Sequence, residues 1–179
     1  MVEIRKILEK ISLPAEVSLL NWVLEDEELV EQLRGGGRAV VIGTDRKFTI
    51  PKELEAKCPG VEVVVVDREK SLSEPAEQVG VRLVVGEVGK DKIEGVDGAS
   101  LVVAKHLLHL VPDKGGVLEG MKKMLKVGGV MAVSVPTLME KGVGEEINNI
   151  GWETEKSEVG KGLGKSLVWK LRSPERLES

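Results

Sequence analysis

The stretch ASLVVAKHLLHLVPDKGGVLEGMKKMLKVGGVMAVSVP, residues 99–136, decides the fold. It opens with an apolar run (99–105), and a segment with a Pro-Asp start that predicts a helix follows at 112–126. The glycine pair 128–129 predicts the end of that helix, and a second apolar run (130–136) comes next. Short apolar runs that alternate with helices are typical of a parallel sheet buried on both faces.

The same alternation extends outward from this stretch. Further apolar runs lie at 38–43, 61–67 and 81–87, and further predicted helices lie at 50–58, 73–80 and 138–149. The pattern predicts an α/β fold, a doubly wound and mostly parallel sheet with helices on both faces.

The C-terminal part has a different pattern. GWETEKSEV (151–159) alternates between polar and apolar residues, and the strand-like SLVWKL (166–171) follows a glycine-rich loop, which predicts an antiparallel hairpin at the sheet edge. The GKS at 164–166 resembles the end of a phosphate-binding P-loop, but that motif requires glycine where Val159 stands and a helix after the loop. We therefore interpret GKGLGKS as a turn.

The N-terminal part predicts helices. Apolar residues at 4, 7, 8 and 11 have the spacing of an amphipathic helix, and further helices are predicted at 15–24 and 26–33, before three glycines. We expect a helical segment at 1–37 that packs on a single α/β domain at 38–172, with a tail at 173–179.

Composition narrows the function classes. With 41% hydrophobic and 31% charged residues, the 179-residue chain has the composition of a globular domain. A net charge of −4 from well-mixed charges gives no signal for nucleic acid or anionic membranes, and no apolar run suits a bilayer span or a signal peptide. The single cysteine, Cys58, favours a reducing cytoplasm, where it is expected to be a buried, inert thiol. Five Asn and Gln residues beside many Glu and Lys weakly suggest a thermophilic source.

This order of elements resembles the class I S-adenosylmethionine-dependent methyltransferases, a Rossmann-like family. The stretch 99–136 carries the resemblance, because the following residues fall at the family's places without a gap: Ala104, His106, His109, Pro112, Asp113, Leu125, Lys126, Gly128 and Gly129. The resemblance implies a seven-stranded sheet of order 3-2-1-4-5-7-6 in which only the seventh strand is antiparallel. It also implies methyl transfer from S-adenosylmethionine to a substrate that the sequence does not identify.

Binding residues follow from the resemblance one position at a time. It implies that Asp67 holds the ribose hydroxyls, that Glu87 approaches the adenine amino group, and that the end of the fourth strand lines the methionine portion and the substrate. A carboxylate at the end of a strand can accept two ribose hydroxyls. The full implied set is Gly43, Thr44, Asp45, Asp67, Arg68, Glu87, Val88, Ala104, Lys105 and His106.

The first loop, VVIGTDRKFTIP (40–51), departs from the family. Val41 stands in place of an acid, and Asp45, Arg46 and Lys47 stand where glycine or other small residues bring the backbone against the cofactor. This leaves two hypotheses open, an active methyltransferase or a non-catalytic binding or subunit module that has lost the cofactor. In the second case, we expect the side chains of residues 45–47 to fill the space of the methionine portion. Alternatively they bind an anion or lie in solvent.

No catalytic group is evident. His106 and His109 are candidates for a general base near neutral pH, but both are also consistent with hydrogen-bonded residues at the pocket rim. A metal site is not expected, because no third ligand lies near them in the sequence. The protein partner and oligomeric state are unknown at this level.

Overall fold

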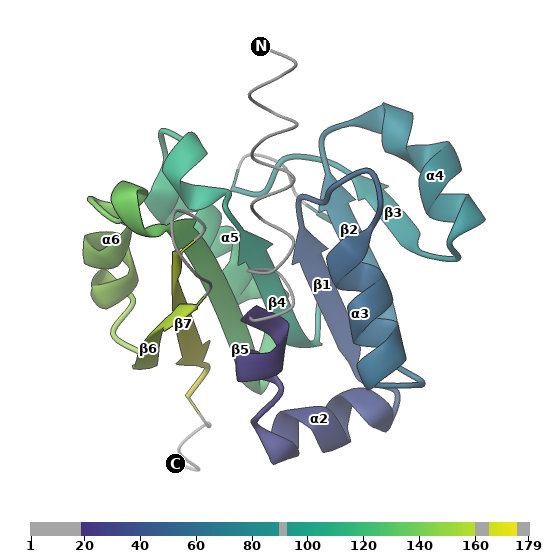
Figure 1. Cartoon of the computed structure of the whole chain (residues 1–179), viewed down its shortest axis with the longest axis horizontal. Coiled ribbons are helices and arrows are strands. Elements are labelled where there is room, and N and C mark those ends of the chain that lie inside the picture. The colour runs from purple at the N-terminus through teal and green to yellow at the C-terminus, as the bar shows by residue number, and fades with distance from the viewer. Residues whose placement is uncertain (1–18, 90–92, 160–164, 175–179) are drawn as a thin grey trace.

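The computed structural model describes residues 19–89, 93–159 and 165–174, which form a seven-stranded sheet with helices on both faces (Figure 1). Its order is β3-β2-β1-β4-β5-β7-β6, as the sequence predicted. The strands are β1 Arg38–Ile42, β2 Glu62–Asp67, β3 Arg82–Val85, β4 Ala99–Lys105, β5 Leu125–Pro136, β6 Glu153–Val159 and β7 Ser166–Arg172.

Strand direction also agrees with the prediction. All pairings among β1 to β5 are parallel, and β7 pairs antiparallel with both β5 and β6. Only β7 therefore runs against the others. The carboxyl ends of β1 to β5 consequently meet at one edge of the sheet, where ligands bind in open α/β folds.

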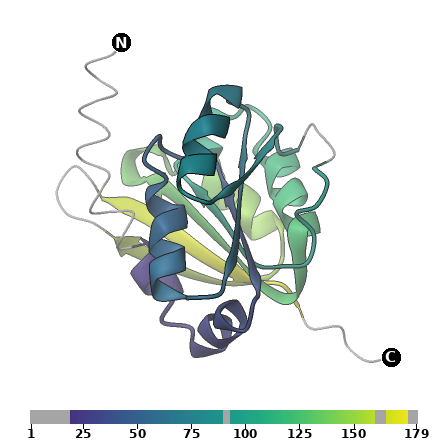
Figure 2. The same ribbon diagram turned by 90° about the vertical axis from the view of Figure 1, so that its right-hand side faces the viewer.

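Helices cover the two faces separately (Figures 1 and 2). One face packs against α5 and α6, and the other packs against the helical residues 19–23, α2, α3 and α4. The helices are α2 Glu27–Arg34, α3 Thr49–Lys57, α4 Ser73–Gln78, α5 Lys114–Met124 and α6 Val143–Asn149, with 3₁₀ turns η1 Lys70–Leu72, η2 Leu108–Leu110 and η3 Thr137–Met139.

The apolar runs of the sequence supply the core to both faces at once. In β1, Val40 and Ile42 pack toward α5, whereas Ala39 and Val41 pack toward α3, and none of the four is more than 3% exposed. Successive side chains of a strand point to opposite faces, so a continuous apolar run is required where both faces are covered. Burial of each of the larger side chains contributes about 1.5–3 kcal/mol.

Two predicted helices have different bounds in the structure. The helix expected at 112–126 ends at Met124, because Leu125 already pairs with Ala99 of β4, so its end was wrongly assigned to the glycines at 128–129. The helix expected at 138–149 is divided into η3 and α6. Gly142 precedes α6 with a φ of +80°, a conformation that interrupts a right-handed helix and favours glycine.

The last strand is tied to the first described helices. Asp26 begins α2 by accepting a hydrogen bond from the Leu29 N–H. The Arg172 guanidinium at the end of β7 forms an ion pair with the same carboxylate. The helix predicted around residues 4–11 lies outside the described residues. Within the described ranges, no helix is long and apolar enough to cross a membrane.

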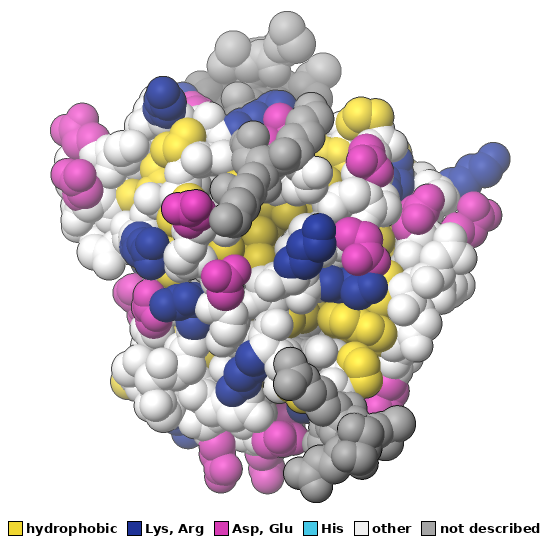
Figure 3. Space-filling model, turned by 180° about the vertical axis from the view of Figure 1, so that it is seen from behind, with side chains coloured by type: hydrophobic (Ala, Val, Ile, Leu, Met, Phe, Trp, Pro, Cys, Tyr) yellow, Lys and Arg dark blue, Asp and Glu magenta, His cyan; other side chains and the backbone are white. Residues whose placement is uncertain are grey.

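The face that carries α5 and α6 shows mixed charge (Figure 3). Acidic and basic side chains are interspersed over the visible surface, with apolar side chains between them. Such mixing gives no extended field of one sign on this face.

Candidate functional site

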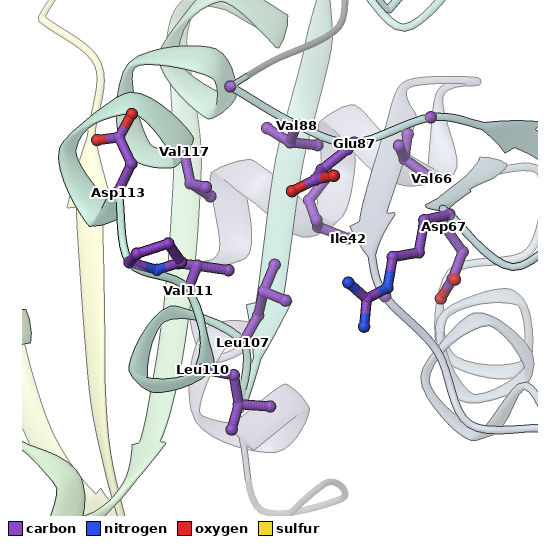
Figure 4. Close-up of a pocket in the computed structure, with 15 residues that line it drawn as sticks. Ile42, Val66, Asp67, Glu87, Val88, Leu107, Leu110, Val111, Asp113 and Val117 are labelled. Carbon is purple, nitrogen blue, oxygen red and sulfur yellow. The ribbon is translucent and has the colours of Figure 1, made fainter.

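A cleft of about 190 Å³ lies at the carboxyl ends of the parallel strands (Figure 4). In Figure 4, Asp67 and Glu87 approach it from one side, and Leu107, Val111 and Val117 from the other. The side chains come from the ends of β1 and β2, the loops after β3 and β4, and α5. The cleft is therefore a largely apolar slot that Arg68 also lines, with Asp67 and Glu87 on one side and Asp113 on the other.

Asp67, the last residue of β2, is held by backbone donors. Its Oδ1 accepts from the Glu69 N–H at 2.9 Å, and its Oδ2 accepts from the Thr44 N–H at 3.2 Å. Each carboxylate oxygen has a further lone pair, so two ribose hydroxyls can still donate to this group. The bonds from the backbone fix the carboxylate at the cleft and join it to the first loop.

Gly43 leaves β1 with a φ of +72°, and its N–H donates to the Val66 carbonyl at 2.8 Å. A Cβ built on this glycine meets no atom within 4 Å, so its backbone borders open space. A ligand can therefore approach the chain closely here, and a residue with a side chain would be strained at this φ.

The altered first loop is closed on itself. The Asp45 carboxylate accepts from the N–H groups of Lys47 and Thr49, at 3.1 and 3.0 Å, and from Thr49 Oγ1 at 2.6 Å. Phe48 adopts a φ of +53° and is fully buried against the α3 face of the sheet. Asp45 thus satisfies donors at the start of α3, as a capping residue does.

The side chains that replace the expected small residues do not line the cleft. Arg46 is 79% exposed and forms a long ion pair with Glu69, at 3.5 Å, and Lys47 is exposed. Asp45 is turned toward α3. None of these three side chains therefore lines the cleft.

The structure brings together about half of the implied cofactor residues. Around the cleft lie Gly43, Asp67, Arg68, Glu87 and Val88, whereas Thr44, Asp45, Ala104, Lys105 and His106 do not line it. Ala104 is fully buried in the core on the α5 face, and the fourth strand contributes through Leu107 and Val111, which follow it. The sequence analysis missed these two residues, although the apolar spacing of LLHLV around them was visible.

His106 follows β4 in an unusual conformation. Its φ is +48°, its N–H donates to the Ser134 carbonyl at 2.8 Å, and its ring Nε2 lies 2.9 Å from Ser166 Oγ. Burial lowers the pKa of His106 to about 4, with smaller contributions from the charges of Lys105 and His109. The ring is therefore neutral near pH 7.

The surrounding corner of the sheet contains unpaired polar atoms. His109 Nδ1, Ser134 Oγ and Thr137 Oγ1 are buried and have no hydrogen-bond partner among the residues that the structure describes. Burial also lowers the pKa of His109, and the Lys114 charge contributes. The His106 and His109 ring centroids are 6.2 Å apart. Unpaired buried polar groups are rare and often mark functional places.

Other candidate groups offer no chemistry. Cys58 is buried at the end of α3, and burial raises the pKa of its thiol, so it is a poor nucleophile. No three His, Cys, Asp or Glu side chains within the described ranges are grouped to hold a metal.

The GKS motif does not precede a helix. Ser166 begins β7, and Lys165 Nζ pairs with Glu158 Oε1 of β6 at 2.6 Å, so a P-loop is absent from this place. The predicted turn itself falls mainly on residues 160–164, which lie outside the described residues.

Comparison with known proteins places the fold. No protein-family model matches the chain, and no curated protein matches its sequence. A SAM-dependent methyltransferase from Aquifex aeolicus superposes with a TM-score of 0.67 at 17% identity, covering 93% of this chain and 97% of its own. The N-methyltransferase NodS from Bradyrhizobium japonicum, in complex with S-adenosyl-L-homocysteine, gives 0.61 at 16% identity, with 92% and 99% covered. A TehB-like SAM-dependent methyltransferase from Corynebacterium glutamicum gives 0.62 at 16% identity, with 82% and 87% covered. Together with the strand order and the position of the cleft, these similarities show that the chain has the class I methyltransferase fold.

Proposed function

We propose that the chain binds S-adenosylmethionine with its adenosine part in the cleft and transfers the methyl group to an acceptor. The observation that carries this proposal is Asp67, whose carboxylate is fixed at the end of β2 beside an apolar slot and keeps lone pairs for two hydroxyls. A ribose next to a flat, apolar base matches that combination.

The described residues fit the adenosine part best. Ile42, Val66 and Val88 offer apolar surface to a purine, and Glu87 offers a carboxylate to its exocyclic amino group. The cleft volume, about 190 Å³, is below the roughly 300–1,000 Å³ typical of ligand pockets. The methionine portion would therefore extend past Gly43, where the backbone borders open space.

The cofactor supplies a methyl group already activated by a positive sulfur. The protein has only to hold that methyl group in line with the acceptor atom, so orientation accounts for most of the catalysis. A general base is not required at the site, which agrees with two histidines whose pKa values are lowered. The fixed Asp67 and the rigid strand ends are suited to such positioning.

A second candidate function is a non-catalytic module that binds only the nucleoside part. The altered first loop favours it, because Asp45, Arg46 and Lys47 stand where the resemblance implies small residues that let the backbone approach the methionine portion closely. This candidate predicts equal binding of adenosine and the complete cofactor.

Calorimetry and thermal unfolding with S-adenosylmethionine, S-adenosylhomocysteine and adenosine test both functions. At about a hundred times its dissociation constant, a ligand adds about 2.7 kcal/mol, which raises the midpoint of a domain this size by about 5–10 °C. Asp67→Asn should abolish most of the rise. Asp97→Asn is the matched control, since this exposed aspartate lies before β4 at the opposite edge of the sheet.

The outcomes separate the candidates. A rise with both sulfur compounds that exceeds the rise with adenosine supports the methyltransferase. Equal rises with all three support the nucleoside module. The absence of a rise with any of them at millimolar concentration rejects both functions.

A further inference from the structure

His106 and Ser166 form a hydrogen bond that crosses the end of a strand. Residue 106 follows β4 and Ser166 begins β7, with β5 between them in the sheet. The ring Nε2 lies 2.9 Å from the hydroxyl oxygen, and the backbone N–H of His106 is fixed on Ser134 of β5. A histidine with a φ of +48° is thus anchored at both its backbone and its ring.

The direction of this hydrogen bond follows from the partners available. Ser166 is 2% exposed, and Nε2 is the hydrogen-bond partner that the described part of the chain gives its hydroxyl. If the ring donated through Nε2, the buried hydroxyl hydrogen would be left without an acceptor among the described residues, which is unfavourable for a buried polar group. The satisfied arrangement is the one in which the Ser166 hydroxyl donates and Nε2 accepts.

A neutral imidazole carries one proton, so this arrangement places the proton on Nδ1. Within the described ranges, Nδ1 of His106 has no hydrogen-bond partner. It is not fully buried, so a ligand or water can reach it. Nearby, Ser134 Oγ and His109 Nδ1 are buried and unpaired. The accessible N–H therefore lies at the corner of the sheet where other polar atoms also lack partners.

We infer that Ser166 holds His106 as the Nδ1-protonated tautomer, so that the end of β4 offers the methyl acceptor a neutral N–H donor and not a base. The acceptor molecule then presents an oxygen or nitrogen lone pair to this N–H. As it bonds to the methyl carbon, the carbon–sulfur bond breaks, S-adenosylhomocysteine leaves, and the acceptor's proton passes to solvent water. Ser166 acts through His106 and is a positioning residue. The part of the inference that concerns the acceptor rests on the proposed function, but the tautomer does not.

Long-range ¹H–¹⁵N spectra of the full chain, labelled at histidine and recorded at pH 7.5, measure the tautomer directly. The chain has two histidines, so His109→Gln assigns the signals. His106 should show a protonated Nδ1 and an unprotonated Nε2. A ring protonated at Nε2 in the wild-type chain would overturn the inference.

Variants of Ser166 test whether its hydroxyl group is what fixes the tautomer of His106. Ser166→Ala should release the ring into a mixture of tautomers, whereas Ser166→Thr, which keeps the hydroxyl, should retain the single tautomer. If threonine does not fold at this buried position, the smaller Ser166→Cys takes its place, with weaker retention expected from its weak S–H donor. A single unchanged tautomer in a folded Ser166→Ala would also overturn the inference.

The same spectra distinguish this failure from failure of the proposed function. The tautomer is read on the ligand-free chain and does not depend on cofactor binding. A chain that binds no S-adenosylmethionine but shows the Nδ1-protonated ring would reject the methyltransferase and retain the role of Ser166.

Discussion

The loop after β1 and the corner after β4 differ in how they use their polar groups. In the loop, the Asp45 carboxylate accepts three hydrogen bonds from its own neighbours, and Phe48 fills the core. In the corner, His109 Nδ1, Ser134 Oγ and Thr137 Oγ1 are buried and have no partner in the described part of the chain. The polar groups of the loop therefore already have partners within the loop. In the corner, by contrast, polar atoms remain that could form hydrogen bonds with a ligand.

The loop after β1 therefore indicates how the fold is held together, whereas the corner after β4 indicates where a ligand could bind. The first loop departs from the family pattern and the sheet is intact, with the Gly43 N–H donating to the Val66 carbonyl and the Thr44 N–H donating to the Asp67 carboxylate. After β4 the sequence agrees with the family pattern, and His106 there has a positive φ. Such a conformation costs free energy, and strained residues of this kind cluster at binding sites.

Phe48→Ala tests the loop most severely. We expect a loss of about 3–5 kcal/mol in the free energy of unfolding, because the ring is fully buried and its removal leaves a cavity. Urea unfolding measures the loss. Leu138→Ala is the control, since Leu138 is 88% exposed and should change stability by less than about 0.5 kcal/mol. A loss below about 1 kcal/mol for Phe48→Ala would show that the loop is not anchored by its side chain.

His106 gives the corner its pH dependence. The pKa of about 4 lies below the usual histidine value of about 6.5, so as the pH falls the unfolded chain becomes protonated at this residue before the folded chain does. Its contribution to stability is complete above pH 6.5 and decreases toward pH 4, by about 2 kcal/mol between pH 7 and pH 5.

The control for this prediction is His106→Asn, because asparagine also tolerates a positive φ and does not titrate. Urea unfolding at pH 7 and pH 5 should show a smaller loss in the variant. Equal losses in the variant and the wild type would exclude a buried neutral ring.

Asp45→Ala should weaken the loop by about 1 kcal/mol, the usual effect of removing a capping carboxylate. Asp45→Asn should cost less, since its amide oxygen can still accept from the Lys47 and Thr49 N–H groups. Arg46→Ala, at a side chain that is 79% exposed, is the matched control and should change the thermal midpoint little. Comparable effects of Asp45→Ala and Arg46→Ala would contradict the self-closed loop.

The smallest effect is expected at Lys165. Its ion pair with Glu158 joins two half-exposed side chains, and Lys165→Ala should change stability by less than about 0.5 kcal/mol. Binding of ATP or GTP should also be the same in variant and wild type. Nucleotide binding that disappears in Lys165→Ala would restore the phosphate-binding interpretation of the GKS.

Local patterns predicted the centre of the sheet because β1, β2, β4 and the second half of β5 are short apolar runs that are buried on both faces. The same patterns misplaced the end of α5, since Leu125 leaves the helix to pair with Ala99, a contact that local sequence does not encode. At the site, acids at strand ends were visible in the sequence. The bond between His106 and Ser166 was not, because it joins residues 60 positions apart through the order of the strands.

That strand order has a consequence for how the protein is made. β7 lies between β5 and β6 in the sheet, but it leaves the ribosome after both of them. Until residues 166–172 emerge, β6 lacks its partner, and β5 presents unpaired backbone groups along 130–136. An open edge of this kind invites pairing with another chain. A free chain truncated before Ser166 should therefore associate with itself, whereas a chain that includes residues 166–172 can close this edge.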